Sequence, residues 1–142
     1  MGIGFAYAIG AAITWGLVYT IDQKILINTS PIVLLFIDSI ITMLIMLPFA
    51  LYSRIEIKNV FASGWQNIGL IIFTAVLAVL AGYLIFMSIK MLGASMASVI
   101  EIAYPFFVVL FTLIIFRTAP GIYFYIGALL IFVGSALIAY FH

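Results

Sequence analysis

The residues best able to do chemistry in this sequence are a carboxylate and a proline inside a strongly apolar stretch. Glu101 and Pro105 are four residues apart in the segment SVIEIAYPFF (98–107), and Tyr104 lies between them. In a helix, residues four apart share a face, and a proline leaves the carbonyl four residues earlier without its N–H partner. Freed backbone groups persist at membrane depth where they face protein or water. We therefore expect a helix kink at Pro105 and a cavity at Glu101 that holds a proton or a cation.

Three more side chains are predicted at the depth of Glu101. Glu101 and Asp38 are seven and six residues into their spans, and Trp15 and Tyr83 are six and five residues from the ends of theirs. All four counts start from the same side of the membrane. A charge at this depth costs about 2.5–3.5 kcal/mol even on the lenient insertion scale, which favours a functional role. The alternatives are that Glu101 is a protonated or hydrogen-bonded packing residue, and that Asp38 reaches the membrane interface or pairs with Lys24 or Lys90. The aromatic rings would then only fill space.

The sequence contains no pattern typical of an enzyme or a metal site. It has no Cys, and its single histidine is the last residue, His142. There is no glycine-rich phosphate loop, no nucleophile with a histidine and an acid, and no paired-histidine metal motif. We therefore predict no catalytic residue, no metal and no cofactor.

The elements that must position these residues are membrane spans. Of 142 residues, 68% are hydrophobic and 6% are charged, with a mean hydropathy of +1.45, whereas about a quarter of a soluble domain is charged. A spanning helix needs about 20 apolar residues. The net charge of +1 argues against a nucleic-acid partner. We predict a single all-α integral membrane domain over residues 1–142, with five spans at about 3–21, 32–52, 65–88, 94–116 and 120–141.

The connections between these spans are short and carry nearly all the charge. We expect residues 22–31, 53–64, 90–94 and 117–120 to connect neighbouring antiparallel helices. Segment 3–21 is expected to be a retained span, because no Lys or Arg precedes it as in a signal peptide. The side of the N-terminus collects three basic residues and the other side two, so the positive-inside rule favours a cytoplasmic N-terminus. The residues compared are Arg54, Lys58 and Arg117 against Lys24 and Lys90.

Stripes of small residues in two spans predict close helix packing, because such residues let helix backbones approach in lipid. One stripe lies in the third span and one in the fifth, and either face could instead meet a second copy of the chain. The two stripes are Ala75, Ala78 and Gly82, and Gly127, Gly134 and Ser135.

Three stretches of the sequence resemble the EamA-like branch of the drug/metabolite transporter superfamily. They are the pair Trp15-Gly16, the run YLIFMSIKMLGASMASVIEIAYPFFVVLFTLIIF (83–116) and the closing GALLIFVGSALIAY (127–140). The resemblance implies one five-helix half of an inverted-repeat fold. Relatives often have Glu before the proline, where this chain has Tyr104, and many have Gly-Glu at the end of the fourth span, where it has Phe116-Arg117. A role tied to that last glutamate therefore has no residue here to carry it.

The resemblance and the buried acids together predict a small secondary transporter of a prokaryotic cell membrane. We expect it to export a small metabolite, such as an amino acid or an organic cation, in exchange for protons. Its partners would be the bilayer, its substrate and a second copy, antiparallel or replaced by an inverted sister chain. The alternatives are a non-transporting membrane assembly partner and one half of a heterodimeric carrier. The predicted substrate and proton residues are Glu101, Asp38, Tyr104, Trp15 and Tyr83.

Overall fold

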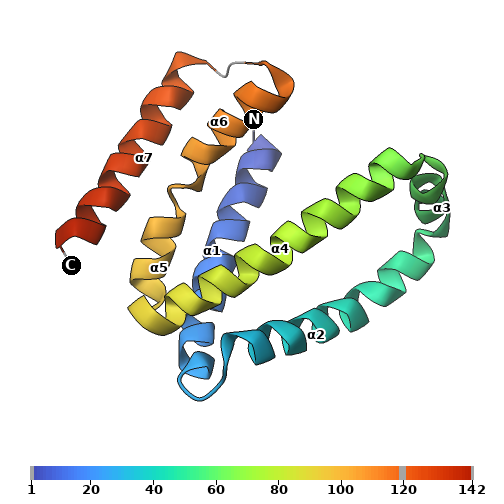
Figure 1. Cartoon of the computed structure of the whole chain (residues 1–142), viewed down its shortest axis with the longest axis horizontal. Coiled ribbons are helices and arrows are strands. Elements are labelled where there is room, and N and C mark those ends of the chain that lie inside the picture. Colours follow the sequence, from blue (N-terminus) through green and yellow to red (C-terminus); the bar gives the residue numbers. More distant parts are fainter. Residues whose placement is uncertain (1, 119–120, 142) are drawn as a thin grey trace. The chain divides into compact units, whose positions relative to one another are not determined.

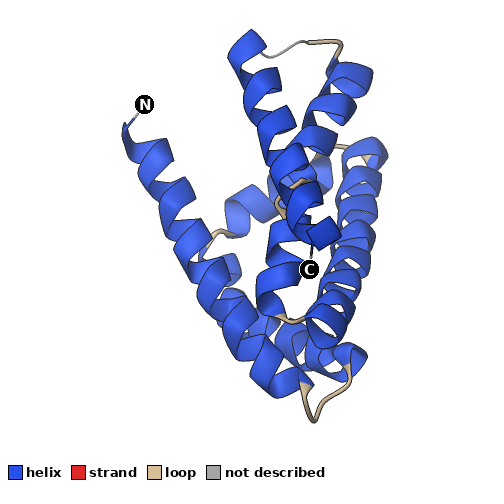
Figure 2. Cartoon of the chain, turned by 90° about the vertical axis from the view of Figure 1, so that its left-hand side faces the viewer, coloured by secondary structure: helices blue, strands red, loops and turns tan. Residues whose placement is uncertain are grey.

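The computed structural model describes residues 2–118 and 121–141, and these residues form helices and connecting turns with no strand (Figures 1 and 2). Five segments are long and apolar enough to cross a membrane, as predicted. The helices are α1 (Gly2–Leu26), α2 (Pro31–Tyr52), α3 (Arg54–Ala62), α4 (Trp65–Leu92), α5 (Ala94–Glu101), α6 (Tyr104–Phe116) and α7 (Ile122–Phe141). The protein is an all-α integral membrane protein.

Several helix ends differ from the predicted spans. Helix α1 continues to Leu26, so Asp22 lies within the helix and not in a connection. Helix α4 continues to Leu92, and Gly93 then turns the chain with φ 82° and ψ 159°. Positive φ of this kind is accessible to glycine at little steric cost. Both helices thus continue through their charged residues, past the end of the apolar run from which the span was predicted. Pro120, predicted to start the fifth span, lies outside the described residues.

The predicted fourth span is interrupted directly after Glu101. Helix α5 ends at that residue, a turn follows at Ile102 and Ala103, and α6 begins at Tyr104 with Pro105 in its first turn. The turn is closed by a hydrogen bond from the Ile102 N–H to the Ser98 carbonyl (3.0 Å). Proline fits the first turn of a helix because its missing N–H has no partner there anyway. The structure therefore has two short helices where one kinked helix was expected, and Glu101 is the last residue before the break.

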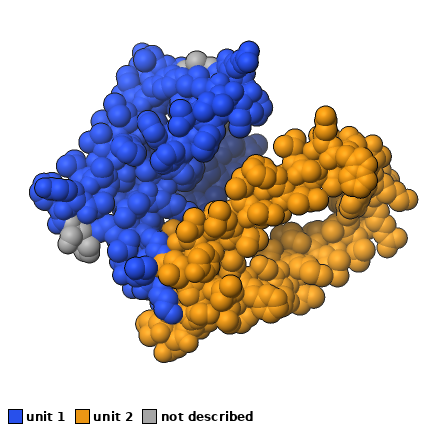
Figure 3. Space-filling model, in the orientation of Figure 1, with its two compact units in different colours: residues 1–24, 88–142 blue, residues 25–87 orange. Residues whose placement is uncertain are grey.

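The chain forms two compact units, residues 1–24 with 88–142 and residues 25–87 (Figure 3). In the first unit, α7 packs against both α5 and α6. A Cβ on Gly127 or Gly134 of the predicted small-residue stripe would meet no atom within 4 Å, so these glycines do not make the close packing predicted for them. Ser135 is buried, and Gly127 and Gly134 are half-buried. The rings of Phe106 on α6 and Phe132 on α7 also contact each other, with centroids 5.1 Å apart.

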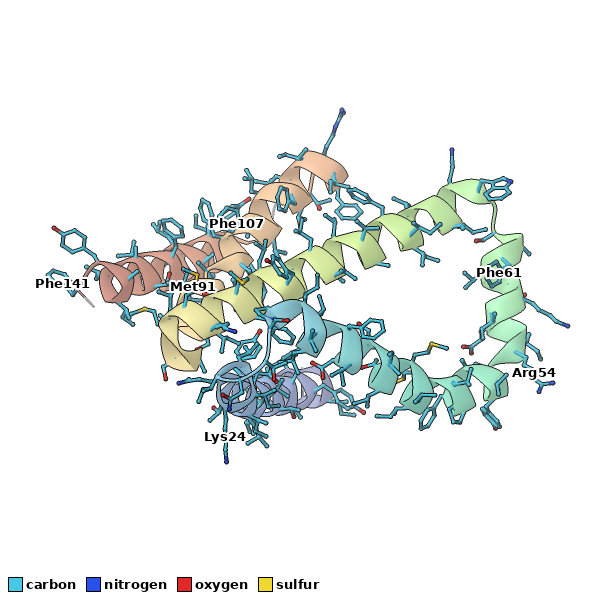
Figure 4. All side chains as sticks on the ribbon, turned by 60° about the horizontal axis from the view of Figure 1, so that its bottom comes forward. Lys24, Arg54, Phe61, Met91, Phe107 and Phe141 are labelled. Atoms are coloured by element: carbon cyan, nitrogen blue, oxygen red, sulfur yellow. The ribbon has the colours of Figure 1, made fainter. Side chains whose placement is uncertain are left out.

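In the second unit, α2 and α4 approach closely at one point. A Cβ on Gly82 would lie 2.9 Å from Leu35 Cδ1, which agrees with the packing role predicted for this glycine. From there α2 and α4 diverge towards α3 (Figure 1). The other two residues of this stripe, Ala75 and Ala78, are exposed. The polar-faced segment between the spans forms α3, which has no buried residue, and Arg54 extends away from it (Figure 4).

Candidate functional site

The side chain of Glu101 is held by a tyrosine from a distant part of the chain. The Tyr19 hydroxyl donates a hydrogen bond to Glu101 Oε2 at 2.6 Å, across a sequence separation of 82 residues. Hydrogen bonds to a carboxylate are shorter and about twice as strong as neutral ones. Tyr19 is half-buried in α1, and Glu101 is exposed at the end of α5. The bond therefore fixes the predicted proton site against α1.

Aromatic rings adjoin this hydrogen bond. The rings of Trp15 and Tyr19, one helical turn apart, have centroids 5.6 Å apart and a tilt of 53°. Tyr104 lies within electrostatic range of the Tyr19 hydroxyl. Trp15 and Tyr104 are 57% and 60% exposed, so much of each ring is open to a ligand. Carboxylate and ring faces together can bind a cation, because aromatic faces attract positive charge.

Two residues near the site, the acid Asp22 and the hydroxyl donor Tyr19, were not predicted from the sequence. Asp22 is only 6% exposed and lies within electrostatic range of Tyr19. Trp15, Tyr19 and Asp22 are spaced by four and three residues, which places them along one face of α1. The spacing could have revealed this face, but the predicted helix ended at residue 21 and left Asp22 in a connection.

The structure does not bring all five predicted site residues into one unit. Trp15, Glu101 and Tyr104 belong to the first unit, whereas Asp38 and Tyr83 belong to the second. Asp38 is half-buried on α2, and Tyr83 is 37% exposed on α4. The single layer of Trp15, Asp38, Tyr83 and Glu101 stays a prediction.

A second polar contact joins α1 to α5 near the other end of α5. The Ala94 N–H donates to Gln23 Oε1 at 2.7 Å. Ala94 is the first residue of α5, where backbone N–H groups have no partner within the helix. The positive-φ turn at Gly93 precedes it, and the Gln23 side chain packs against this turn. Gln23 thus caps α5 in the manner of an N-cap side chain supplied by another helix.

A separate groove of about 480 Å³ lies between α6 and α7. Its lining is mostly apolar and includes Tyr104, Pro105 and Val108 from α6 and Tyr123, Gly127 and Ile131 from α7. Tyr104 is the one predicted substrate residue that reaches it. Among the described residues, no three His, Cys, Asp or Glu side chains gather as metal ligands would.

The chain matches the EamA-like transporter family over residues 2–140. No curated protein and no solved structure matches it.

Proposed function

Since the chain belongs to the EamA-like transporter family, we propose that it is a secondary transporter that exports a small metabolite in exchange for protons. An amino acid or an organic cation suits the site, because each carries a positively charged nitrogen. The observation that carries this proposal is the Glu101 carboxylate, hydrogen-bonded by Tyr19 at 2.6 Å within an otherwise apolar membrane segment. Ionisable residues in spans are costly and mark substrate and proton pathways.

Glu101 would exchange the two ligands by binding one at a time. Deprotonated, it attracts the cationic group of the substrate, and the rings of Trp15 and Tyr104 cover that group. Protonated, it is neutral and releases the substrate. Proton and substrate therefore move in opposite directions, because each binding event requires that the other ligand has left. We also propose a role in substrate or proton binding for Asp38 and Tyr83, which belong to the second unit.

We further propose that two five-helix chains form the carrier in a prokaryotic cell membrane, with the N-terminus cytoplasmic in the favoured orientation. Transporters built from inverted repeats bind their substrates at the interface between the repeats. The second half would be an antiparallel copy or an inverted sister chain. Support comes from a basic-residue difference of only three against two between the two sides, which permits insertion in both orientations.

The competing proposal is a membrane assembly partner that transports nothing, or a chain that is half of a heterodimeric carrier. The Tyr19–Glu101 hydrogen bond also supports the non-transporting assembly partner, because the bond satisfies the acid within the chain. In that case Glu101 would specify helix packing only.

A liposome assay separates these proposals. Purified protein should release protons into the lumen or take them up when a panel of amino acids and organic cations is supplied across the membrane. Glu101→Gln should abolish this flux while the protein stays folded and monodisperse. Glu56→Gln is the matched control, because Glu56 lies on α3 outside the spans, and it should keep the full flux. Full activity of Glu101→Gln would refute the coupling role, and a flux that requires a co-expressed sister chain would favour the heterodimer.

A further inference from the structure

Helix α1 is joined to α5 by two hydrogen bonds that differ in kind. Tyr19 binds the carboxylate of Glu101 at the C-terminal end of α5, and Gln23 binds the backbone N–H of Ala94 at its N-terminal end. Tyr19 and Gln23 are one turn apart on α1 and share a face. The two contacts are therefore made by one short stretch of α1.

Only one of these contacts uses a group that can bind a proton or a cationic ligand. The Gln23 contact joins a neutral amide to a backbone N–H, and neither group changes charge in any proton or cation binding step. The Tyr19 contact uses a carboxylate. A proton or a positively charged ligand at Glu101 neutralises this acceptor and weakens the bond, because charge-assisted hydrogen bonds are about twice as strong as neutral ones.

The N-terminal part of α1 is exposed beyond these contacts. Every residue from Gly2 to Leu17 is exposed, and burial begins at Val18. The helix is thus held near its C-terminal end. Loss of the Tyr19 contact would leave Gln23 as the remaining hydrogen bond between α1 and α5 among those the structure shows.

We propose that Tyr19 is the positioning residue of Glu101, and that its hydrogen bond is a latch which a proton or a cationic substrate group opens. In the closed state Tyr19 orients the carboxylate. When Glu101 gains a proton or a cation, Tyr19 keeps its own proton, loses a charged acceptor and separates, and α1 turns about Gln23. Asp22 from α1 and Tyr104 from α6 are the other titratable groups within electrostatic range of this hydroxyl among the described residues. The identity of the opening ligand rests on the proposed transport function, but the latch itself does not.

Distance measurements test the latch without any transport. The chain has no Cys, so spin labels can be attached specifically at Tyr7 on α1 and Ile115 on α6, both exposed. Labelled protein diluted with unlabelled protein in nanodiscs reports distances within one chain. The control pair, Ile21 and Leu92, lies near the pivot.

Tyr19→Phe and Glu101→Gln should each broaden and lengthen the Tyr7–Ile115 distance distribution and leave the Ile21–Leu92 distribution unchanged. Tyr52→Phe removes the same hydroxyl at a residue that is 94% exposed, and it should match the wild type. Glu101→Asp keeps the charge but shortens the side chain, so it should open the latch as well. It also replaces Glu101→Gln if that variant does not fold. Narrow, unchanged Tyr7–Ile115 distances in Tyr19→Phe and in the Glu101 variants would overturn the proposal.

Transport kinetics give a second readout that a merely structural residue would not produce. Because Tyr19 competes with the substrate for the carboxylate, Tyr19→Phe should lower KM by about tenfold, while maximal transport falls because Glu101 is no longer oriented. A raised KM would contradict this competition. If the wild type carries no flux but the distances change as expected, the transport function fails and the latch stands.

Discussion

At the residue scale, the site depends on how the Glu101 carboxylate binds Tyr19 and still stays open to a ligand. Glu101 has a hydrogen-bond donor in Tyr19, 2.6 Å away, and exposed rings in Trp15 and Tyr104. An acid satisfied in this way tolerates a membrane position better than an isolated charge, because a buried charge needs compensating hydrogen bonds. It remains exposed enough to accept a ligand. The same geometry that stabilises the acid therefore leaves it available for exchange.

Trp15 should contribute to substrate affinity through its exposed ring. A cation over an indole face gains about 0.5–2 kcal/mol, so Trp15→Ala should raise KM for a cationic substrate by about twofold to thirtyfold. Trp15→Phe keeps an aromatic ring and should fall between the alanine variant and the wild type. The measurement is substrate uptake into liposomes against substrate concentration.

Trp65 provides the matched control for this prediction. It is the first residue of α4 and is 87% exposed, as expected of an anchor at the membrane interface. Trp65→Ala should leave KM unchanged. Equal KM values for the two alanine variants would show that Trp15 does not contact the substrate.

At the element scale, the break between α5 and α6 sets the position of Glu101. The acid ends α5, and the turn at Ile102 and Ala103 separates it from Pro105 in the first turn of α6. Side chains next to an interrupted helix move more readily than those within a continuous one, because fewer backbone hydrogen bonds hold them. The break therefore gives the proposed exchange site a local source of movement.

Pro105→Ala should join α5 and α6 into one straighter helix. The substitution adds a backbone N–H that can bond the Glu101 carbonyl four residues earlier. We expect preserved or higher thermal stability, by about 1 kcal/mol or a few degrees in Tm, together with slower transport. Circular dichroism melting and initial transport rates measure the two effects. Pro48→Ala, at the proline inside α2, is the control and should not slow transport; an unchanged turnover in Pro105→Ala would show that the break is not used for movement.

At the scale of the whole molecule, one chain supplies five spans and leaves most of their surface uncovered. In the most apolar window of each candidate span, 0–11% of the residues are buried within the chain. Lipid covers such surfaces without cost, so exposure alone does not require a partner. The proposed second half rests instead on the near balance of basic residues between the two sides and on the way inverted-repeat transporters bind substrate between their repeats.

An antiparallel homodimer should place each connection on both sides of the membrane. A single cysteine at Thr29, in the α1–α2 turn, or at Ser63, at the end of α3, can be labelled from outside intact cells with an impermeant maleimide. In an antiparallel dimer each variant should reach about half of the labelling seen after the cells are permeabilised. Labelling of only one of the two variants from outside would exclude the antiparallel copy and leave a parallel dimer or an inverted sister chain.

The sequence by itself determined the class of protein, the five long apolar segments and an irregularity next to Pro105 in the fourth of them. These features are local, because helix length, hydropathy and the effect of proline depend on residues within a few turns. The ends of α1 at Leu26 and of α4 at Leu92 were not predictable, because the charged residues Asp22 and Lys90 end an apolar run without ending the helix.

Only the tertiary structure decided which side chains meet. The Tyr19–Glu101 bond joins residues 82 positions apart, the Gln23–Ala94 contact joins residues 71 positions apart, and Asp22 proved to be buried. Helices that are apolar on nearly every face have no sequence pattern that sets their rotation about the helix axis. That rotation determines whether Tyr19 or another residue of α1 meets the acid, and it is set by packing between distant segments of the chain.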